Sequence, residues 1–277
     1  MDFGKSFVYM FQDPSWFRKL LIGTLLVLAA ILFSWLLVGL IPLLIVLGWA
    51  QVTLRNVLDG QEHPMPEWED WGDFIVRGLK LGVAMLIWLL PIFILILPMI
   101  LGSALLGNQS NSSAAGGVLI ACASCLMLLW GIFVALISPS IYIRLAATGR
   151  LRSAFEASRL WRITREHLGP VIISLLLIAV AGFIGSIVGS LGIVLCLIGA
   201  LITGPLAMLW QYLVTAHLFG QIGGLDRAAR SDDLALLEPL PAPIEVAPFP
   251  APVEPPAPEI GPTAPEAPAP DAPTGQQ

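Results

Sequence analysis

The sequence of 277 residues has few charged side chains, and long stretches of it have none. Asp, Glu, Lys and Arg make up 12% of the residues, whereas soluble globular domains carry about 25%. None of the four occurs in residues 20–54, 81–143 or 167–225. A helix needs roughly 20 apolar residues to cross a bilayer, so the second and third stretches are each long enough for two spans. Because a soluble helix would keep a polar face along such stretches, the missing charge predicts an integral membrane protein.

The apolar stretches also lack the groups that catalysis and ion-driven transport use. They contain no Asp or Glu for proton transfer, no paired aspartates and no Ser–His pair in a Gly-x-Ser-Gly setting. Polar groups inside a membrane are functional candidates, but a structural role is the simpler explanation for Gln51, Gln211 and His217. Cys122 and Cys125 lack the further ligands of a zinc site and are expected to be buried helix residues. The sequence therefore predicts a protein that is not an enzyme, without catalytic, cofactor-binding or metal-binding residues.

Six apolar segments predict an all-α, polytopic membrane bundle of about six transmembrane helices. They are residues 20–38, 42–58, 81–107, 117–143, 168–189 and 193–218. The first two share the stretch 20–54, which as one straight helix would be about 50 Å long, too long for a single span. Gly39 and Pro42 favour a break and a tight hairpin. One long kinked helix, giving five spans, is the alternative. Short connections without charge are expected at 107–116 and 189–192.

Basic residues in short loops predict which ends of the helices face the cytoplasm. Residues 144–167 contain six arginines, whereas the two short connections contain no Lys or Arg. We therefore expect residues 144–167, the polar segment 55–80 and the C-terminal tail to be cytoplasmic. The N-terminus, with three basic residues among its first 19, has the same character. Both ends of 20–54 lie on one side only if this stretch crosses twice, so the charges favour six spans over five.

The polar segment 55–80 combines a turn, two prolines, acidic residues and tryptophans. Acids that follow Pro66 favour the start of a helix through its dipole, and Trp68 and Trp71 would then lie on one helix face. We interpret the segment as an interfacial helix that leads into the next span. A divalent cation would need several converging oxygens, so helix capping and a solvated face explain the acids more simply. The acids that would share a face are Glu67, Asp70 and Asp73.

The arginines of residues 144–167 are the best candidates for a binding role. A helical wheel places five charged residues on one broad face: Arg152, Glu156, Arg159, Arg162 and Glu166. At this spacing Glu156 is expected to pair with Arg152 and Arg159. A basic helix at the inner leaflet contacts anionic lipid headgroups, although topology alone also accounts for basic residues there. The residues assigned to headgroup contact are Arg152, Arg159, Arg162 and Arg165.

Residues 231–277 differ in composition from the rest of the chain. They hold 14 of the 23 prolines and eight acids but no Lys or Arg, and without them the chain has 14 basic and 11 acidic residues. Such a segment cannot bury enough apolar surface to fold. We expect a membrane domain over residues 1–230 and a disordered, extended tail over residues 231–277. A solvated tail is favoured over a docking segment for a protein partner.

The most distinctive motif of the sequence comprises Pro66, Glu67, Trp68, Asp70, Trp71, Gly72 and Asp73. Around it stand Arg55-Asn-Val-Leu-Asp-Gly60, Gly78-Leu-Lys80, Phe11-x-Asp-Pro-Ser-Trp16, Lys19-Leu-Leu-Ile-Gly23 and Gly48-Trp49. With these residues the chain resembles the DUF4013 family of multi-pass membrane proteins, whose function is unknown. The similarity covers about residues 3–220 and excludes the tail. The resemblance implies a multi-pass fold and supplies no catalytic residue.

The leading functional expectation is a non-enzymatic membrane component, such as a scaffold or an assembly or envelope factor. Its partners would be the lipid bilayer and a protein bound through the tail, not nucleic acid. The alternative is a transporter or channel-like protein for a neutral or lipid-like solute, which kinks at Pro91, Pro98 and Pro205 would suit. A membrane enzyme is the third interpretation. A transporter would need a cavity with polar lining groups, whereas a scaffold would be a closed apolar bundle.

Overall fold

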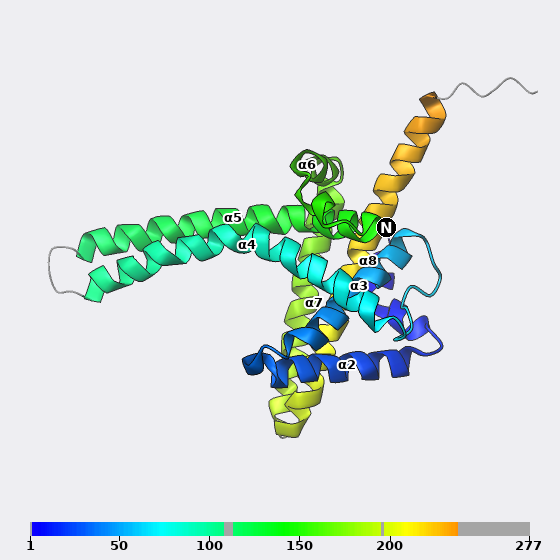
Figure 1. Ribbon diagram of the computed structural model, residues 1–277, viewed down its shortest axis with the longest axis horizontal. Helices are drawn as coiled ribbons and strands as arrows, with labels where there is room; N and C mark the ends of the chain where they lie inside the picture. The colour runs from blue at the N-terminus through cyan, green and yellow to red at the C-terminus, as the bar shows by residue number, and fades with distance from the viewer. Residues whose placement is uncertain (1, 108–112, 195–196, 238–277) are drawn as a thin grey trace, which may run out of the picture. The chain divides into compact units, whose positions relative to one another are not determined.

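The computed structural model describes residues 2–107, 113–194 and 197–237, and its ribbon is drawn in Figure 1. Residues 1–235 form one unit and residues 236–277 a second. The described residues are mostly helical and contain no strand, which confirms the all-α prediction. The α-helices are α1 (Lys5–Val8), α2 (Trp16–Leu32), α3 (Leu40–Leu58), α4 (Trp71–Gly107), α5 (Ser113–Thr148), α6 (Ala157–Glu166), α7 (Leu168–Val194) and α8 (Leu197–Leu237). Short 3-10 helices are η1 (Tyr9–Gln12), η2 (Ser34–Leu36) and η3 (Leu151–Phe155).

The charge-free stretch 20–54 folds as two helices, as predicted, and the break between α2 and α3 covers residues 33–39. Leu37 ends η2 in the left-handed region, with φ of 58°. At Gly39 a Cβ atom would collide with backbone atoms of the preceding turn, so this tight turn requires a glycine. Pro42 lies in the first turn of α3, where its missing N–H costs no helical hydrogen bond.

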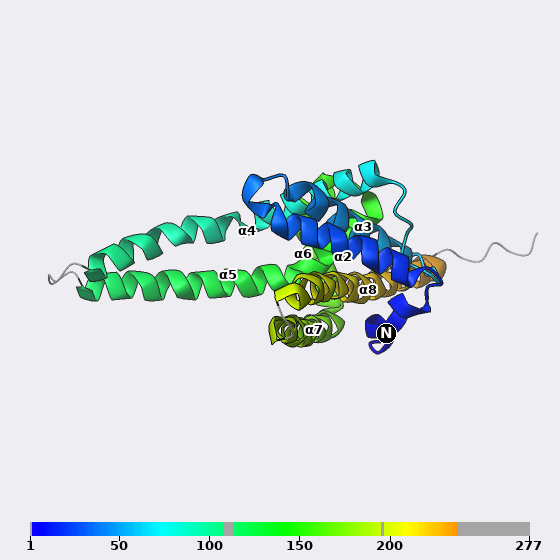
Figure 2. The same ribbon diagram turned by 90° about the horizontal axis from the view of Figure 1, so that it is seen from below.

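Helices α4 and α5 form a long antiparallel hairpin that projects from the other helices (Figures 1 and 2). Both are longer than the predicted spans 81–107 and 117–143, because α4 already begins at Trp71 and α5 continues to Thr148. In the most apolar 18-residue window of α4, only 6% of the residues are buried. Lipid would cover such a surface in a bilayer, since water would not tolerate so much exposed hydrocarbon.

The cysteines of α5 do not behave as predicted. Cys122 and Cys125 are free and exposed on the surface of the α4–α5 hairpin, so the expectation of burial is wrong for both. Among the described elements, only α4 lies beside this part of α5 (Figure 1). Cys196 lies outside the described residues.

Helices α7 and α8 lie side by side in both ribbon views (Figures 1 and 2). The predicted turn at 189–192 is wrong, because these residues continue α7 to Val194. Gly189 instead serves close packing, since a Cβ there would lie 3.8 Å from the Cα of Gly204 in α8. Helix α8 extends to Leu237, so the first residues of the predicted tail are helical. The rest of that tail lies outside the described residues.

Among the described residues, α3, α4, α5 and α7 are long and apolar enough to cross a membrane. The N-terminal segment Lys5–Gln12 and α2, bent by 109° relative to each other, count as a fifth if the bent pair is one span. The structure thus has four to five membrane-type helices, and the predicted six spans are not confirmed. The difference lies in α2, which qualifies only with its bent neighbour, and in α8, which is not among the qualifying helices.

Helices α3 and α4 cross at direct backbone contact. A Cβ atom on Gly48 would overlap the carbonyl oxygen of Phe74, and one on Gly78 would overlap that of Leu44. Only glycine permits this approach. The crossing places the second half of α3, including Trp49, against the segment that precedes α4.

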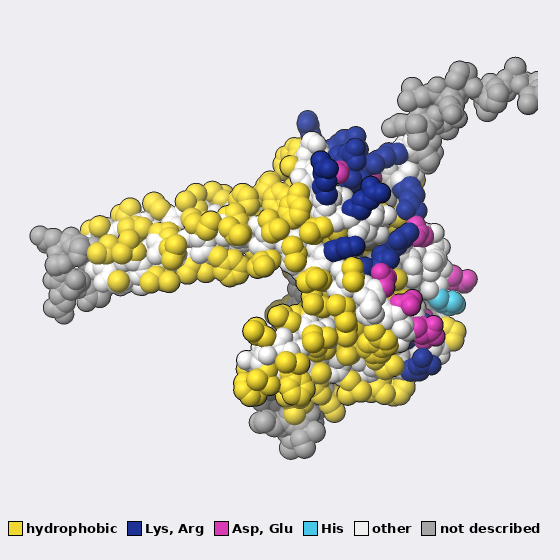
Figure 3. Space-filling model, viewed as in Figure 1, with side chains coloured by type: hydrophobic (Ala, Val, Ile, Leu, Met, Phe, Trp, Pro, Cys, Tyr) yellow, Lys and Arg dark blue, Asp and Glu magenta, His cyan; other side chains and the backbone are white. Residues whose placement is uncertain are grey.

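The polar ends of the helices are bonded to one another. The bonds join Asp2 to Gln221, Lys80 to the carbonyl of Gly149, and Arg227 to Asp59. In Figure 3, charged side chains gather around this end, whereas the α4–α5 hairpin and the lower helices present a hydrophobic surface. The segments that the charge pattern assigned to one side of the membrane therefore meet in the fold.

Candidate functional site

A buried ion cluster joins the N-terminal segment to the segment before α4. The Lys19 ammonium lies 2.7 Å from Asp13 Oδ2 and 3.0 Å from Glu67 Oε1. The side chains of Lys19 and Asp13 are 5% and 4% exposed. Ser15, which precedes α2, donates its N–H to Asp13 Oδ1, and its hydroxyl lies 2.8 Å from Asp13 Oδ1 and 3.1 Å from Glu67 Oε1. Lys19 also donates to the carbonyl oxygen of Met65, at 2.7 Å.

The cluster keeps both carboxyl groups ionised. Burial raises the pKa of Asp13, but hydrogen bonds from Lys19 and Ser15, with the Lys19 charge, outweigh it and hold this pKa below 3.8. The hydrogen bond from Lys19 holds the pKa of Glu67 below 4.5, against a smaller effect of burial. A buried ion pair is retained only when its charges are compensated in this way. The cluster therefore holds the N-terminal segment against the segment before α4, which is far from it in sequence.

Two tryptophans fix the family-like motif on α3. The rings of Trp49 and Trp68 stack with centroids 4.6 Å apart and an interplanar angle of 9°. Both side chains are buried. Trp49 Nε1 donates to the carbonyl oxygen of Pro66, and Trp68 Nε1 donates to that of Lys19, at 3.0 and 3.1 Å. Stacked aromatic rings with satisfied N–H groups are a stable anchor. The motif thus packs the N-terminus, α2 and α3 together.

The predicted helix that leads into the next span begins later than expected, at Trp71, and the expected helix start at the acids after Pro66 is wrong. Residues 61–70 form bends, a turn and irregular backbone without a helix. Trp68 is buried whereas Trp71 is 40% exposed, so the two rings share no helix face. Glu67 bonds Lys19 instead of joining the other acids, while Asp73 pairs with Arg77 one turn along α4. The exposed members of the motif are Asp70, Trp71, Gly72 and Asp73.

His217 has structural surroundings, as expected. It is buried, its Nδ1 lies 2.9 Å from the hydroxyl of Ser6, and Gln221 Nε2 lies 3.0 Å from the same nitrogen. The ring stacks on Tyr9 at a centroid distance of 4.3 Å, and the Tyr9 hydroxyl donates to the carbonyl oxygen of Leu213. These contacts fasten the N-terminal helices to α8.

The two glutamines differ in their surroundings. Gln51 is buried in α3, and neither its amide oxygen nor its nitrogen has a hydrogen-bond partner among the described residues. Gln211 of α8 lies beside Gly182 of α7, where a Cβ would come within 3.0 Å of the amide nitrogen. Gln211 lines a hollow between α7 and α8.

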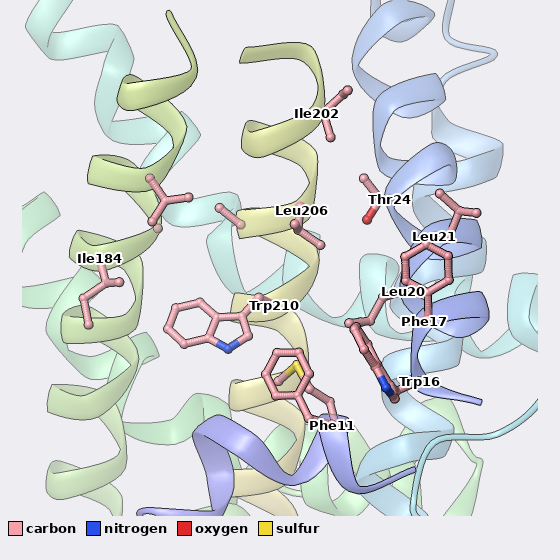
Figure 4. A pocket seen from close by; sticks show the side chains of 14 residues that line it. Phe11, Trp16, Phe17, Leu20, Leu21, Thr24, Ile184, Ile202, Leu206 and Trp210 are labelled. Carbon is pink, nitrogen blue, oxygen red and sulfur yellow. The ribbon is translucent and has the colours of Figure 1, made fainter. Parts of the chain in front are cut away.

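An apolar groove with a volume of about 480 Å³ lies between α2 and the α7–α8 hairpin. Figure 4 shows the aromatic and aliphatic side chains of α2 on one side and those of α8 opposite, with Ile184 of α7 beyond them. Phe11 of η1 closes one end. The labelled lining residues are Phe11, Trp16, Phe17, Leu20, Leu21, Thr24, Ile184, Ile202, Leu206 and Trp210. The Thr24 hydroxyl has no hydrogen-bond partner among the described residues.

A second hollow of about 370 Å³ adjoins the groove. The two share Gly185 and Ala207 as lining residues, and the second adds the polar side chains of Ser186 and Gln211. A Cβ atom added to Gly185 would lie 3.5 Å from the Cβ of Ala207. Small residues on α7 therefore leave room here. The groove could not be predicted from the sequence, because α2, α7 and α8 carry apolar residues on all faces and the sequence does not show which of these faces pack against one another.

The arginine segment folds as η3 and α6 with Glu156 between them, not as one helix. The predicted pairing of Glu156 with Arg152 is wrong. Glu156 Oε2 instead accepts a hydrogen bond from Arg144, at 2.6 Å, and forms an ion pair with Arg159, at 3.1 Å. Arg152 and Arg159 line one hollow, and Arg162 and Arg165 line a separate one beside Trp161. The predicted headgroup contact of these four arginines remains a prediction.

The structure brings together three side chains of the kinds that bind metal ions, a cluster that the sequence did not predict. Glu166, His167 and Asp226 bring their ligand atoms within 4.8 Å of one another, because the junction between α6 and α7 lies beside α8. Arg230 lies 2.6 Å from Asp226 Oδ2 and already balances this carboxylate. We therefore assign these residues to an ion-pair network between helices.

Comparison with known proteins supports the resemblance found in the sequence. A family model described as "Protein of unknown function (DUF4013)" matches residues 31–197. The matched range includes Trp49 and the motif at 66–73 and leaves out Asp13 and Lys19, so the wider similarity over residues 3–220 stays a prediction. The chain matches no curated protein and no solved structure.

Proposed function

The chain belongs to the DUF4013 family, described as of unknown function, and we propose that it is a non-enzymatic membrane protein that holds a lipid-like molecule. The observation that carries this proposal is the apolar groove between α2 and the α7–α8 hairpin. Its volume of about 480 Å³ falls within the roughly 300–1,000 Å³ of small-molecule sites. This assignment favours the solute-binding alternative over a closed bundle.

The chemistry of the lining selects the ligand class. Aromatic and aliphatic side chains surround the groove, and Thr24 supplies the one hydroxyl among the described lining residues. Water gains little in such a space, because it needs two to four polar partners. A hydrocarbon chain would fill it without loss of hydrogen bonds, because it has no polar group that would need a partner.

The proposed orientation follows from the bonded polar ends. We place the N-terminus, residues 55–80, residues 144–167 and the C-terminal tail on the cytoplasmic side, with α2 and α8 completing six spans. Contacts among these segments support one common side for them, and the six arginines of 144–167 support the cytoplasm. The groove would then open toward hydrocarbon, with Phe11 and Trp16 at its cytoplasmic end.

Photocrosslinking tests lipid binding in the groove. The full chain, reconstituted into vesicles with a phospholipid bearing a diazirine on its acyl chain, should give crosslinked peptides from α2 and α8. Leu206→Trp would fill part of the groove and lower this yield. Leu97→Trp, on the exposed face of α4, is the matched control and should leave it unchanged. Equal yields from both variants, or crosslinks spread evenly over α4 and α5, would contradict the proposal.

A second candidate function is the membrane scaffold expected from the sequence. The Lys19–Asp13–Glu67 cluster favours it, because it holds the polar face rigid and so suits that face to dock a partner. Purification in mild detergent with and without residues 238–277 would test it. Loss of a stoichiometric partner on deletion supports a scaffold that acts through its tail, and unchanged partners count against that role.

A further inference from the structure

A preformed basic hollow lies where α5 ends and α6 begins. It has a volume of about 570 Å³, and four arginines line it: Arg144, Arg150, Arg152 and Arg159. Glu156 is the single acid in its lining, so the hollow carries an excess of three positive charges. Within the described part of the chain, the guanidinium groups of Arg150 and Arg152 have no acidic partner within 4 Å.

Arg144 indicates that the hollow is built for an anion. Its side chain is only 14% exposed, and one of its nitrogens pairs with Glu156. Its Nε is fully buried and has no hydrogen-bond partner among the described residues. A buried charged donor without a partner is costly. Glu156 is shared between Arg144 and Arg159, so an oxyanion bound in the hollow would add negative charge where the guanidinium groups outnumber the carboxylates.

Hydrogen bonds from α4 hold the backbone that forms the walls of the hollow. Lys80 of α4 donates to the carbonyl oxygen of Gly149, at 2.8 Å, and Trp88 donates to that of Ala154, at 3.0 Å. Gly149 takes a positive φ of 64°, which turns the chain sharply after α5. The hydroxyls of Thr148 and Ser153 bond each other across the turn, at 2.7 Å. Binding would therefore require little ordering of the backbone, which favours affinity.

The position of the hollow selects the source of the anion. Figure 3 shows the basic side chains next to the hydrophobic surface of the α4–α5 hairpin. Trp161, whose ring stacks on Phe133 of α5, is 50% exposed, and exposed tryptophans sit at the headgroup level of membranes. A phospholipid whose chains lie along α4 and α5 would place its phosphate in reach of the hollow.

We propose that the hollow bounded by Arg144, Arg150, Arg152 and Arg159 binds the phosphate group of an anionic phospholipid. Guanidinium groups suit phosphate because their paired N–H donors match two of its oxygens. This site lies apart from the apolar groove, and its assignment does not depend on lipid binding there. It also narrows the earlier expectation, since Arg162 and Arg165 border a different hollow and are left out.

Native mass spectrometry of the purified full chain tests the site, with phosphatidylglycerol and phosphatidylcholine of identical acyl chains as probes. The wild type should bind phosphatidylglycerol more tightly. Arg150→Gln with Arg152→Gln should weaken that binding roughly tenfold or more. Arg162→Gln with Arg165→Gln removes the same charge elsewhere and should have little effect. Circular dichroism melts of both double variants check that folding is retained.

Each other outcome overturns the proposal or part of it. Equal losses in the two double variants would show general attraction of charge and overturn the site. Retained preference for phosphatidylglycerol in Arg150→Gln with Arg152→Gln would overturn it as well. Inorganic phosphate that binds the wild type alone and displaces phosphatidylglycerol would keep the phosphate site and overturn the lipid as its source.

Discussion

The ammonium nitrogen of Lys19 lies 2.7 Å from Asp13 Oδ2, and both side chains are at least nine-tenths buried. This pair, with Glu67, joins the N-terminal segment to the segment before α4. Its removal should therefore affect the whole polar face rather than one side chain.

Lys19→Met should destabilise the protein by about 3–5 kcal/mol, because it leaves the Asp13 carboxylate buried without its partner. Thermal unfolding in detergent, followed by size-exclusion chromatography, measures the change. Arg18→Ala is the matched control: Arg18 is 65% exposed and lies 3.6 Å from Glu67, and its loss should cost less than about 1 kcal/mol. Similar shifts for the two variants would argue against a special role for Lys19.

Acid should weaken the same cluster. The folded-state pKa values of Asp13 and Glu67 lie below their ordinary values of 3.8 and 4.5. A lowered carboxyl pKa contributes stability that is present above the ordinary pKa and is lost as pH falls below it. Melting temperatures measured from pH 7 to pH 3 should drop below about pH 4.5. Lys19→Met should flatten that drop, and an unchanged profile in this variant would assign the acid sensitivity to other groups.

Gly48→Ala should separate α3 from α4, because the added methyl group would overlap the Phe74 carbonyl and backbone atoms cannot move away cheaply. Overpacking of this kind costs about 1–3 kcal/mol. Gly82→Ala on α4 provides the comparison, since its Cβ would lie an ordinary 3.7 Å from Leu44 and the substitution should be neutral or slightly stabilising. The measurement is again thermal unfolding in detergent, and a neutral Gly48→Ala would contradict the close crossing.

Cysteine labelling tests the proposed sidedness. In a background with the native cysteines replaced by serine, Ser34→Cys in η2 should react with an impermeant maleimide on intact cells. Ser158→Cys at the start of α6 should react only after the membrane is permeabilised. The reverse pattern would invert the orientation. Protection of both positions on intact cells would place the α2–α3 turn on the same side as the arginines, and the six-span arrangement would then be wrong.

The existence of the helices could be predicted from the sequence because it depends on one-dimensional quantities. The charge-free stretch 20–54 is longer than one span needs. Gly39 and Pro42 predict a break close to the observed turn at residues 33–39. The ends of the helices were harder to place. Gly189 and Gly192 resemble turn residues, yet at least Gly189 packs against α8, because in a membrane bundle small residues serve close helix contact as often as chain reversal.

The candidate site depends on pairings that a single sequence does not contain. Glu67 follows a proline and fits the start of a helix, but its carboxylate pairs with Lys19, 48 residues earlier, and Glu67 lies in an irregular segment before α4. Tertiary pairing thus outweighs a local preference for helix that amounts to about 1 kcal/mol at most. A charged Lys19 and Asp13 so close to an apolar span were the sequence signal for this cluster. For the groove no such signal exists, since α2 carries apolar residues on every face.

The bonds from Lys80 and Trp88 to the backbone at Gly149 and Ala154 tie the arginine segment to α4. A long hairpin in a thinner bilayer tilts to keep its hydrocarbon covered. Because α4 holds that segment at two points, we expect any such tilt to carry the arginines with it. A change in bilayer thickness would then move the arginine segment, and spin-label distances between α4 and α8 in short-chain and long-chain lipids would measure the movement.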